Sequence, residues 1–207
     1  MPVTGQLLSA AILGNCTARG IKGRDIGAIA DAVGTSVATH VTTQNMVSCT
    51  LAGTAGPTGS ITSLAVLGIV SKVMSATMQG RATLLKLTGR ELPKLFDGIS
   101  AGISQVFLGM VLTGTVVGCA VGGGTGKFTA LNSTVLANLM SRQMRKRKNN
   151  IRGRDMPLLC DCVSFGVVTH LKSSATFSVV VAGAIAPVPP VGPLAVVAIP
   201  SVTTKVS

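Results

Sequence analysis

The sequence contains no tryptophan and no tyrosine, and aromatic residues make up only 2% of its 207 residues. A hydrophobic core must therefore be built from Ala, Val, Leu, Ile, Met and a few Phe. Apolar residues reach 47% of the chain, which is enough for such a core. The lack of Trp and Tyr also removes the usual stacking platforms for single-stranded nucleic acid.

Carboxylates are almost as scarce as aromatic residues. The chain has six Asp and Glu against 18 Lys and Arg, which gives a net charge of +12. All six acids fall at positions of an internal repeat described below, so each has a structural explanation. Because acid–base catalysis needs carboxylates or other bases free for that work, we expect that the protein is not an enzyme.

Long hydrophobic runs without breakers are also missing. The best candidate for a membrane span, residues 176–199, contains four prolines, and the uncharged run 32–71 is broken by polar and Gly-Pro segments. The mean hydropathy of +0.59 is nevertheless high for a soluble monomer. We therefore expect much of the surface to be buried against partners, with an integral membrane protein as the alternative.

The five cysteines form no recognised metal or disulfide pattern. Their number is odd, and the N-terminal sequence MPVTGQLL lacks the basic start and apolar block of a signal peptide. We expect free thiols in a reducing compartment, mostly acting as small buried apolar side chains. These residues are Cys16, Cys49, Cys119, Cys160 and Cys162.

One short motif recurs three times, each time before an amphipathic pattern. The motif is Gly-Arg-acid-apolar, and its copies begin at Gly23, Gly89 and Gly153. Apolar residues then follow at i, i+3, i+4, i+7 and i+11, which is one face of a helix. They are Ile26, Ile29, Ala30, Val33 and Val37 in the first copy, Leu92, Leu95, Phe96, Ile99 and Ile103 in the second, and Met156, Leu159, Cys160, Val163 and Val167 in the third. The sequence therefore predicts three equivalent helices and an internal repeat.

Segments on either side of these helices complete the predicted module. A further helix precedes each motif, over residues 7–19, 67–87 and 135–148. Stretches rich in Thr, Val and Gly follow each helix, over residues 47–62, 111–129 and 177–199, and favour β-hairpins or paired strands. We predict an α+β fold of three tandem helix–turn–helix–β-hairpin modules, spanning residues 1–66, 67–132 and 133–207.

The repeated charges have a structural interpretation. The acid of each motif, Asp25, Glu91 or Asp155, is expected to start its helix by accepting free backbone N–H groups. A second acid follows six residues later in each copy, at Asp31, Asp97 and Asp161. We expect these to pair with the motif arginines Arg24, Arg90 and Arg154, within a module or between modules.

The densest basic run lies in the third module, at the end of a predicted helix. It is a candidate patch for docking to an acidic neighbouring subunit, with nucleic acid as the less favoured partner and a solvated face as the simplest alternative. Its residues are Arg142, Arg145, Lys146, Arg147, Lys148 and Arg152.

The sequence has no complete motif for catalysis, for a cofactor or for a metal. Residues 122–129 look like a phosphate-binding loop, but the first required Gly is Val121 and the residue after Lys127 is Phe128. His40 and His170 occupy equivalent positions at helix ends, where we expect them to face solvent or a partner. We therefore expect no catalytic residue, no metal site, no cofactor and no small-molecule substrate.

The composition and modules resemble small virion structural proteins of tailed bacteriophages. The segments that carry this resemblance are residues 53–62, 113–131 and the three Gly-Arg-acid helices. The resemblance implies a tail, baseplate or neck component that is made in the host cytoplasm and acts through protein–protein contacts in the virion. A head or capsid-associated protein, or a basic protein that contacts nucleic acid, is the alternative within this class.

Overall fold

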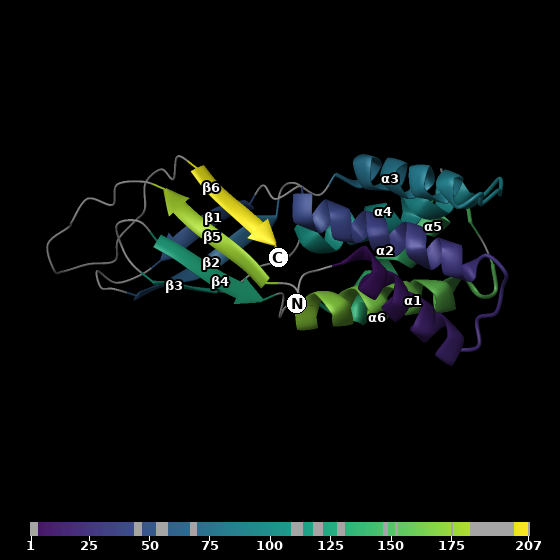
Figure 1. Ribbon diagram of the computed structural model, residues 1–207, viewed down its shortest axis with the longest axis horizontal. Coiled ribbons are helices and arrows are strands. Elements are labelled where there is room, and N and C mark those ends of the chain that lie inside the picture. The colour runs from purple at the N-terminus through teal and green to yellow at the C-terminus, as the bar shows by residue number, and fades with distance from the viewer. Residues whose placement is uncertain are drawn as a thin grey trace, which may run out of the picture.

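The computed structural model describes residues 4–43, 47–52, 58–66, 70–108, 114–117, 122–127, 131–146, 149–151, 153–174, 176–182 and 201–206. Its side chains are described in residues 4–42, 70–107, 131–146, 149–151 and 153–174. The helices gather at one end of the molecule and the strands at the other (Figure 1).

The helices come in three pairs, and each pair is joined by a short connection that carries one copy of the Gly-Arg-acid motif. They are α1 (Gly5–Ala18), α2 (Ile26–Thr43), α3 (Ser71–Leu84), α4 (Leu92–Leu108), α5 (Ser133–Arg145) and α6 (Met156–Ser174). The three motif glycines occupy equivalent turns, as predicted. Their carbonyl oxygens accept the first N–H group of the following helix, at 3.2–3.3 Å in the pairs Gly23–Ile26, Gly89–Leu92 and Gly153–Met156.

The first helix of each pair also ends in the same way. Gly20, Lys86 and Asn150 have φ of 76°, 56° and 45°, the left-handed conformation that ends many helices. The next residue, which is apolar, donates its N–H to a carbonyl near the helix end, at 2.9–3.0 Å. These donor–acceptor pairs are Ile21–Cys16, Leu87–Ala82 and Ile151–Met144. The connection in the third pair is two residues longer, yet it keeps this ending.

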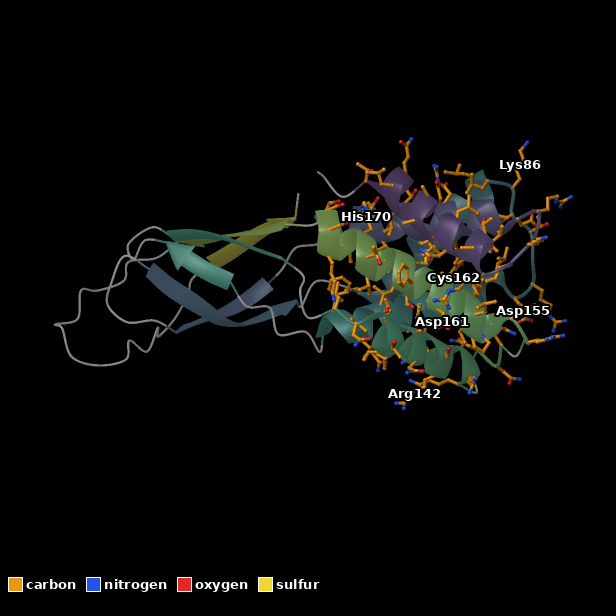
Figure 2. All side chains as sticks on the ribbon, turned by 90° about the horizontal axis from the view of Figure 1, so that it is seen from below. Lys86, Arg142, Asp155, Asp161, Cys162 and His170 are labelled. Atoms are coloured by element: carbon orange, nitrogen blue, oxygen red, sulfur yellow. The ribbon has the colours of Figure 1, made fainter. Side chains whose placement is uncertain are left out.

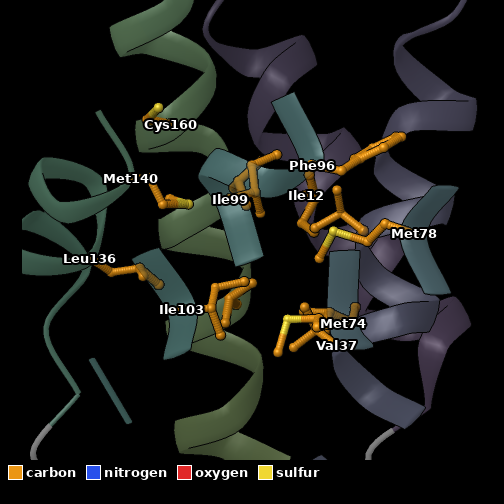
Figure 3. Packing of buried hydrophobic residues seen from close by; sticks show 14 of the residues in the cluster. Ile12, Val37, Met74, Met78, Phe96, Ile99, Ile103, Leu136, Met140 and Cys160 are labelled. Atoms are coloured by element: carbon orange, nitrogen blue, oxygen red, sulfur yellow. The ribbon is translucent and has the colours of Figure 1, made fainter. Parts of the chain in front are cut away.

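The six helices form a closed ring around one core. Each helix packs against the helices before and after it in sequence, and α6 packs against α1. Fully buried side chains from the ring fill its centre (Figure 3), where no Trp or Tyr is needed. The first helices contribute three equivalent sets, one turn apart: Leu8, Ile12 and Cys16 from α1, Met74, Met78 and Ala82 from α3, and Leu136, Met140 and Met144 from α5.

Glycine allows close contact at two of the three seams, which are the contacts between the second helix of one pair and the first helix of the next. A Cβ atom at Gly102 of α4 would lie 2.8 Å from the Cα of Met140, and one at Gly166 of α6 would lie 2.9 Å from the N of Ile12. Gly102 and Gly166 are equivalent positions of the repeat. At the remaining seam, α2–α3, the equivalent residue is Ser36, which is fully buried.

Six strands form one antiparallel sheet in the order β1-β2-β3-β4-β5-β6. They are β1 (Val47–Ala52), β2 (Thr58–Val66), β3 (Gly114–Val117), β4 (Gly122–Lys127), β5 (Thr176–Ala182) and β6 (Ser201–Val206). Strands from different helix pairs are neighbours in it, since β2 pairs with β3 and β4 pairs with β5. The predicted turns at residues 56–57 and 189–190 lie outside the described residues.

The predicted fold class is wrong. Within the residues whose side chains are described, the chain is all helical, with six helices and no strand, rather than a series of α+β modules that each have their own β-hairpin. The physical reason is that the apolar faces of the six helices bury one another in a closed ring. Within the described side chains, the core therefore needs no hairpin to cover it.

The seam glycines lead to a stability prediction. Gly102→Ala and Gly166→Ala should each lower the free energy of unfolding by about 1–3 kcal/mol, because the added methyl meets the backbone of the facing helix. Gly14→Ala and Gly80→Ala are matched controls, since nothing lies within 4 Å of their added Cβ atoms. These controls should gain up to about 1 kcal/mol from helix propensity. Urea unfolding measures all four, and equal effects in the two groups would contradict close seam packing.

Candidate functional site

The connections within the three helix pairs lie at the end of the bundle away from the sheet, and this end is rich in cations. Figure 2 shows Lys86 and Asp155 there, with His170 near the opposite end of the bundle. We call this surface the basic end. Its exposed cations in the described residues are Arg19, Lys22, Arg24, Lys86, Arg90, Arg145, Lys146 and Arg154, against the carboxylates of Asp25, Glu91 and Asp155. Arg142 lies further back, on the side of the bundle (Figure 2).

Most of these cations have no partner within the described part of the chain. Arg24 lies 3.3 Å from Asp25, and Glu91 is held by Lys94 at 2.9 Å, so two of the three motif carboxylates are already paired. The cations that make no ion pair among the described residues are Lys22, Lys86, Arg90, Arg145, Lys146 and Arg154. The excess positive charge is therefore available to an outside partner.

A surface hollow of about 340 Å³ lies beside these cations, between the end of α5 and the start of α6. Apolar side chains of Ile151, Met156 and Pro157 line it together with the cation Arg145. Such a lining suits an apolar side chain that is followed or preceded by a carboxylate.

Part of the basic patch predicted from the sequence belongs to this end, whereas Arg142 lies on the side of the bundle (Figure 2). Arg142, Arg145 and Lys146 are exposed at the end of α5 or just beyond it. Arg147, Lys148 and Arg152 lie outside the described residues. What the sequence reasoning missed is that the cations of the first two connections lie at the same end of the bundle.

Two of the three second repeated acids bond across the seams. Asp31 of α2 accepts a hydrogen bond from Nε of Arg81 in α3, at 2.8 Å. Asp161 of α6 accepts one from Arg19, which follows α1, at 3.4 Å. Thus two acids join one helix pair to the next. At the third seam, Gln143 of α5 donates instead to Gln105 of α4, at 2.7 Å.

The predicted pairing of the motif arginines is wrong. Asp31 and Asp161 use arginines at or near the ends of first helices, and Asp97 accepts from the hydroxyl of Ser75 at 2.6 Å. Arg24 contacts only the neighbouring Asp25, and Arg90 and Arg154 form no ion pair among the described residues. The motif arginines are exposed on the connections, whereas the second acids lie further along the following helices.

The motif acids also differ from the prediction. Their backbone carbonyls, not their side chains, receive helix N–H groups: Asp25 from Ile29, Glu91 from Leu95 and Asp155 from Leu159, each at 2.9 Å. Their carboxylates still lie at the positive ends of the helix dipoles.

The two histidines are buried rather than facing solvent, which corrects the prediction. His40 and His170 are 3% and 7% exposed, and in neither does Nε2 find a hydrogen-bond partner within the described structure. Burial lowers the pKa of both below the ordinary 6.5, because the charged imidazolium would lose its hydration. Module two has Val106 at this position, so the site tolerates an apolar residue.

The three described cysteines are free and buried. Burial raises the pKa of Cys160 and Cys162, and it raises that of Cys16 to about 12. Their thiols are therefore protonated at neutral pH and poor nucleophiles.

Comparison with known proteins identifies no relative: no family model, no curated protein and no solved structure matches the chain. Across the described ranges, no helix is both long and apolar enough to cross a membrane. In the same residues, no cluster of three His, Cys, Asp or Glu side chains could hold a metal ion.

The seam ion pairs can be tested by double-mutant cycles. Arg81→Gln combined with Asp31→Asn should show a coupling energy of about 0.2–1 kcal/mol, since the pair is only half-buried. The matched cycle Arg90→Gln with Asp97→Asn should show none. Coupling between Arg90 and Asp97, measured by urea unfolding, would restore the rejected pairing.

The buried histidines predict a pH dependence of stability. The pKa of each histidine is lower in the folded chain than in the unfolded chain, so the unfolded chain binds protons first as the pH decreases. The stability is therefore fully present above pH 6.5 and falls as the pH decreases below this value. Replacing both residues with the Val of module two, in His40→Val/His170→Val, should flatten this slope in thermal melts between about pH 7 and pH 5. An unchanged slope would mean that other groups cause it.

Proposed function

We propose that the protein is a structural subunit of a larger assembly, and that it docks through its basic end onto an acidic surface of a neighbouring subunit. The observation that carries this proposal is the group of exposed cations at one end of a closed helical ring, most of which make no ion pair with any described residue. Such a surface attracts an acidic partner, and its cations would form ion pairs when that subunit binds.

The hollow beside Arg145 supports a protein partner. A hollow lined by Ile151, Met156 and Pro157 can bury an apolar side chain, which a phosphate backbone does not supply. Interfaces of this kind combine a buried apolar anchor with charged pairs at the rim. A duplex nucleic acid would use the cations alone.

The particular assembly we propose is the virion of a tailed bacteriophage, with the subunit in the tail, baseplate or neck. This rests on the resemblance in composition and repeated modules described above. The architecture is compatible with such a role, because one chain folds into a compact ring with a distinct docking end.

The test follows the subunit into the assembled particle. In density gradients of particles from the source cells, the wild-type chain should co-sediment with the particle. The double charge reversal Arg145→Glu/Lys146→Glu should leave the chain mostly unassembled at the top of the gradient. A matched control, Lys72→Glu/Lys172→Glu, reverses two exposed cations outside the basic end and should assemble normally.

Two results would overturn the proposal. Normal assembly of the Arg145→Glu/Lys146→Glu chain, with an unchanged melting temperature, would make the basic end a solvated face. Tight binding of the wild-type chain to fluorescent duplex DNA, with a steep loss of affinity as salt rises and with the same variant abolishing it, would favour nucleic acid as the partner.

A further inference from the structure

The seam that closes the ring contains two facing thiols. Cys16 of α1 and Cys162 of α6 are both fully buried, and they lie close enough for each thiol to shift the pKa of the other. Figure 2 shows Cys162 inside the helical bundle, away from its two ends. Neither cysteine is oxidised in the structure.

The backbones of the two helices are almost in contact beside these thiols. A Cβ atom on Gly166 would lie 2.9 Å from the N and 3.0 Å from the Cα of Ile12. Gly166 is one turn after Cys162, and Ile12 is one turn before Cys16. Because the two helices are antiparallel, Cys16 and Cys162 lie opposite each other, one turn from the contact between Gly166 and Ile12. Backbones this close suit the short Cα–Cα distance of a disulfide.

The position of the thiol pair within the ring is also distinctive. The seams α2–α3 and α4–α5 join helices that follow each other in the chain, whereas α6–α1 joins its beginning to its end. The residues equivalent to this pair are Ala32 and Ala82 at one of the other seams and Gly98 and Met144 at the remaining one. Thus the facing thiols occur at the seam that the polypeptide itself does not bridge.

We propose that Cys16 and Cys162 are a latent disulfide that locks the ring closed under oxidising conditions. The two thiols together lose two protons and two electrons as the S–S bond forms. A small-molecule disulfide such as oxidised glutathione takes them up and is reduced to two thiols. The lock joins the first and last helices, so it restricts opening of the whole ring.

Burial determines when the lock forms. The thiolate is the attacking species in disulfide exchange, and burial keeps Cys16 protonated with a pKa raised to about 12. Oxidation of the closed ring is therefore slow, and the bond forms mainly when the seam opens or as the chain folds. If the chain is a virion subunit, which is the function proposed above, it would stay reduced in the cytoplasm and become locked after release.

Refolding in a mixture of oxidised and reduced glutathione tests the proposal, because the thiols are exposed to the oxidant in the unfolded chain. Wild-type chain is refolded, free thiols are blocked with iodoacetamide, and peptides are mapped by mass spectrometry. We expect one dominant disulfide, between Cys16 and Cys162, and a Tm about 5 °C or more above that of the reduced protein. Adding a reducing agent should remove the shift.

Two single variants separate the proposed pair from its neighbour. Cys160→Ser changes a buried thiol of α6 that lies 3.7 Å from the sulfur of Met144, and it should keep both the disulfide and the Tm shift. Cys162→Ser should lose both. The proposal is overturned if Cys16 and Cys162 are recovered alkylated from refolded wild-type chain, if Cys16 pairs with another cysteine, or if the cross-linked chain melts no higher than the reduced one.

Discussion

The close contact between the second helix of each pair and the first helix of the next is the constraint on which the rest of the ring depends. Gly102 and Gly166 let the backbones approach until a methyl group would not fit. That approach places the other seam residues within reach of one another, including the Asp161–Arg19 ion pair and the thiols of Cys16 and Cys162. Where the glycine is replaced by Ser36, its hydroxyl is buried without a partner in the described structure. The three seams thus use equivalent positions of the repeat and differ in the chemistry that holds them.

The sequence predicted the parts of the fold that depend on local periodicity. The second helices and their starting turns follow from the motif and from apolar residues on one face, and the structure has both. The fold class was wrong because composition cannot say whether Thr- and Val-rich segments cover a helix or pair elsewhere. The helices cover one another, and the strands of different pairs join in one sheet. Closure of α6 onto α1 could not be predicted, since it joins residues from the two ends of the chain.

The candidate site shows the same division. The cluster at the end of α5 was visible as a run of cations, but the contribution of Lys22 or Lys86 needs the arrangement of the three connections. The pairing of Asp31 with Arg81 was missed for a related reason: the first helices align only when the two extra residues before Gly153 are recognised. When Leu8, Met74 and Leu136 are aligned, Arg81 falls at the same position of the repeat as Asn15 and Gln143. This position faces the seam. The burial of His40 and His170 had one signal, the apolar Val106 at the equivalent position.

Equivalent positions of the repeat have similar residues in the core, whereas the three surface connections differ. This difference bears on how the ring would bind the proposed partner. Leu8, Met74 and Leu136 are interchangeable because packing only requires similar volume at each level. The connections are not interchangeable: the third is longer, has more cations in its sequence than either of the other two, and borders the hollow beside Arg145. A partner of the proposed kind that is centred on the ring axis would favour three similar connections. The unequal charge and the single hollow instead favour a partner that contacts the ring mainly at the third connection.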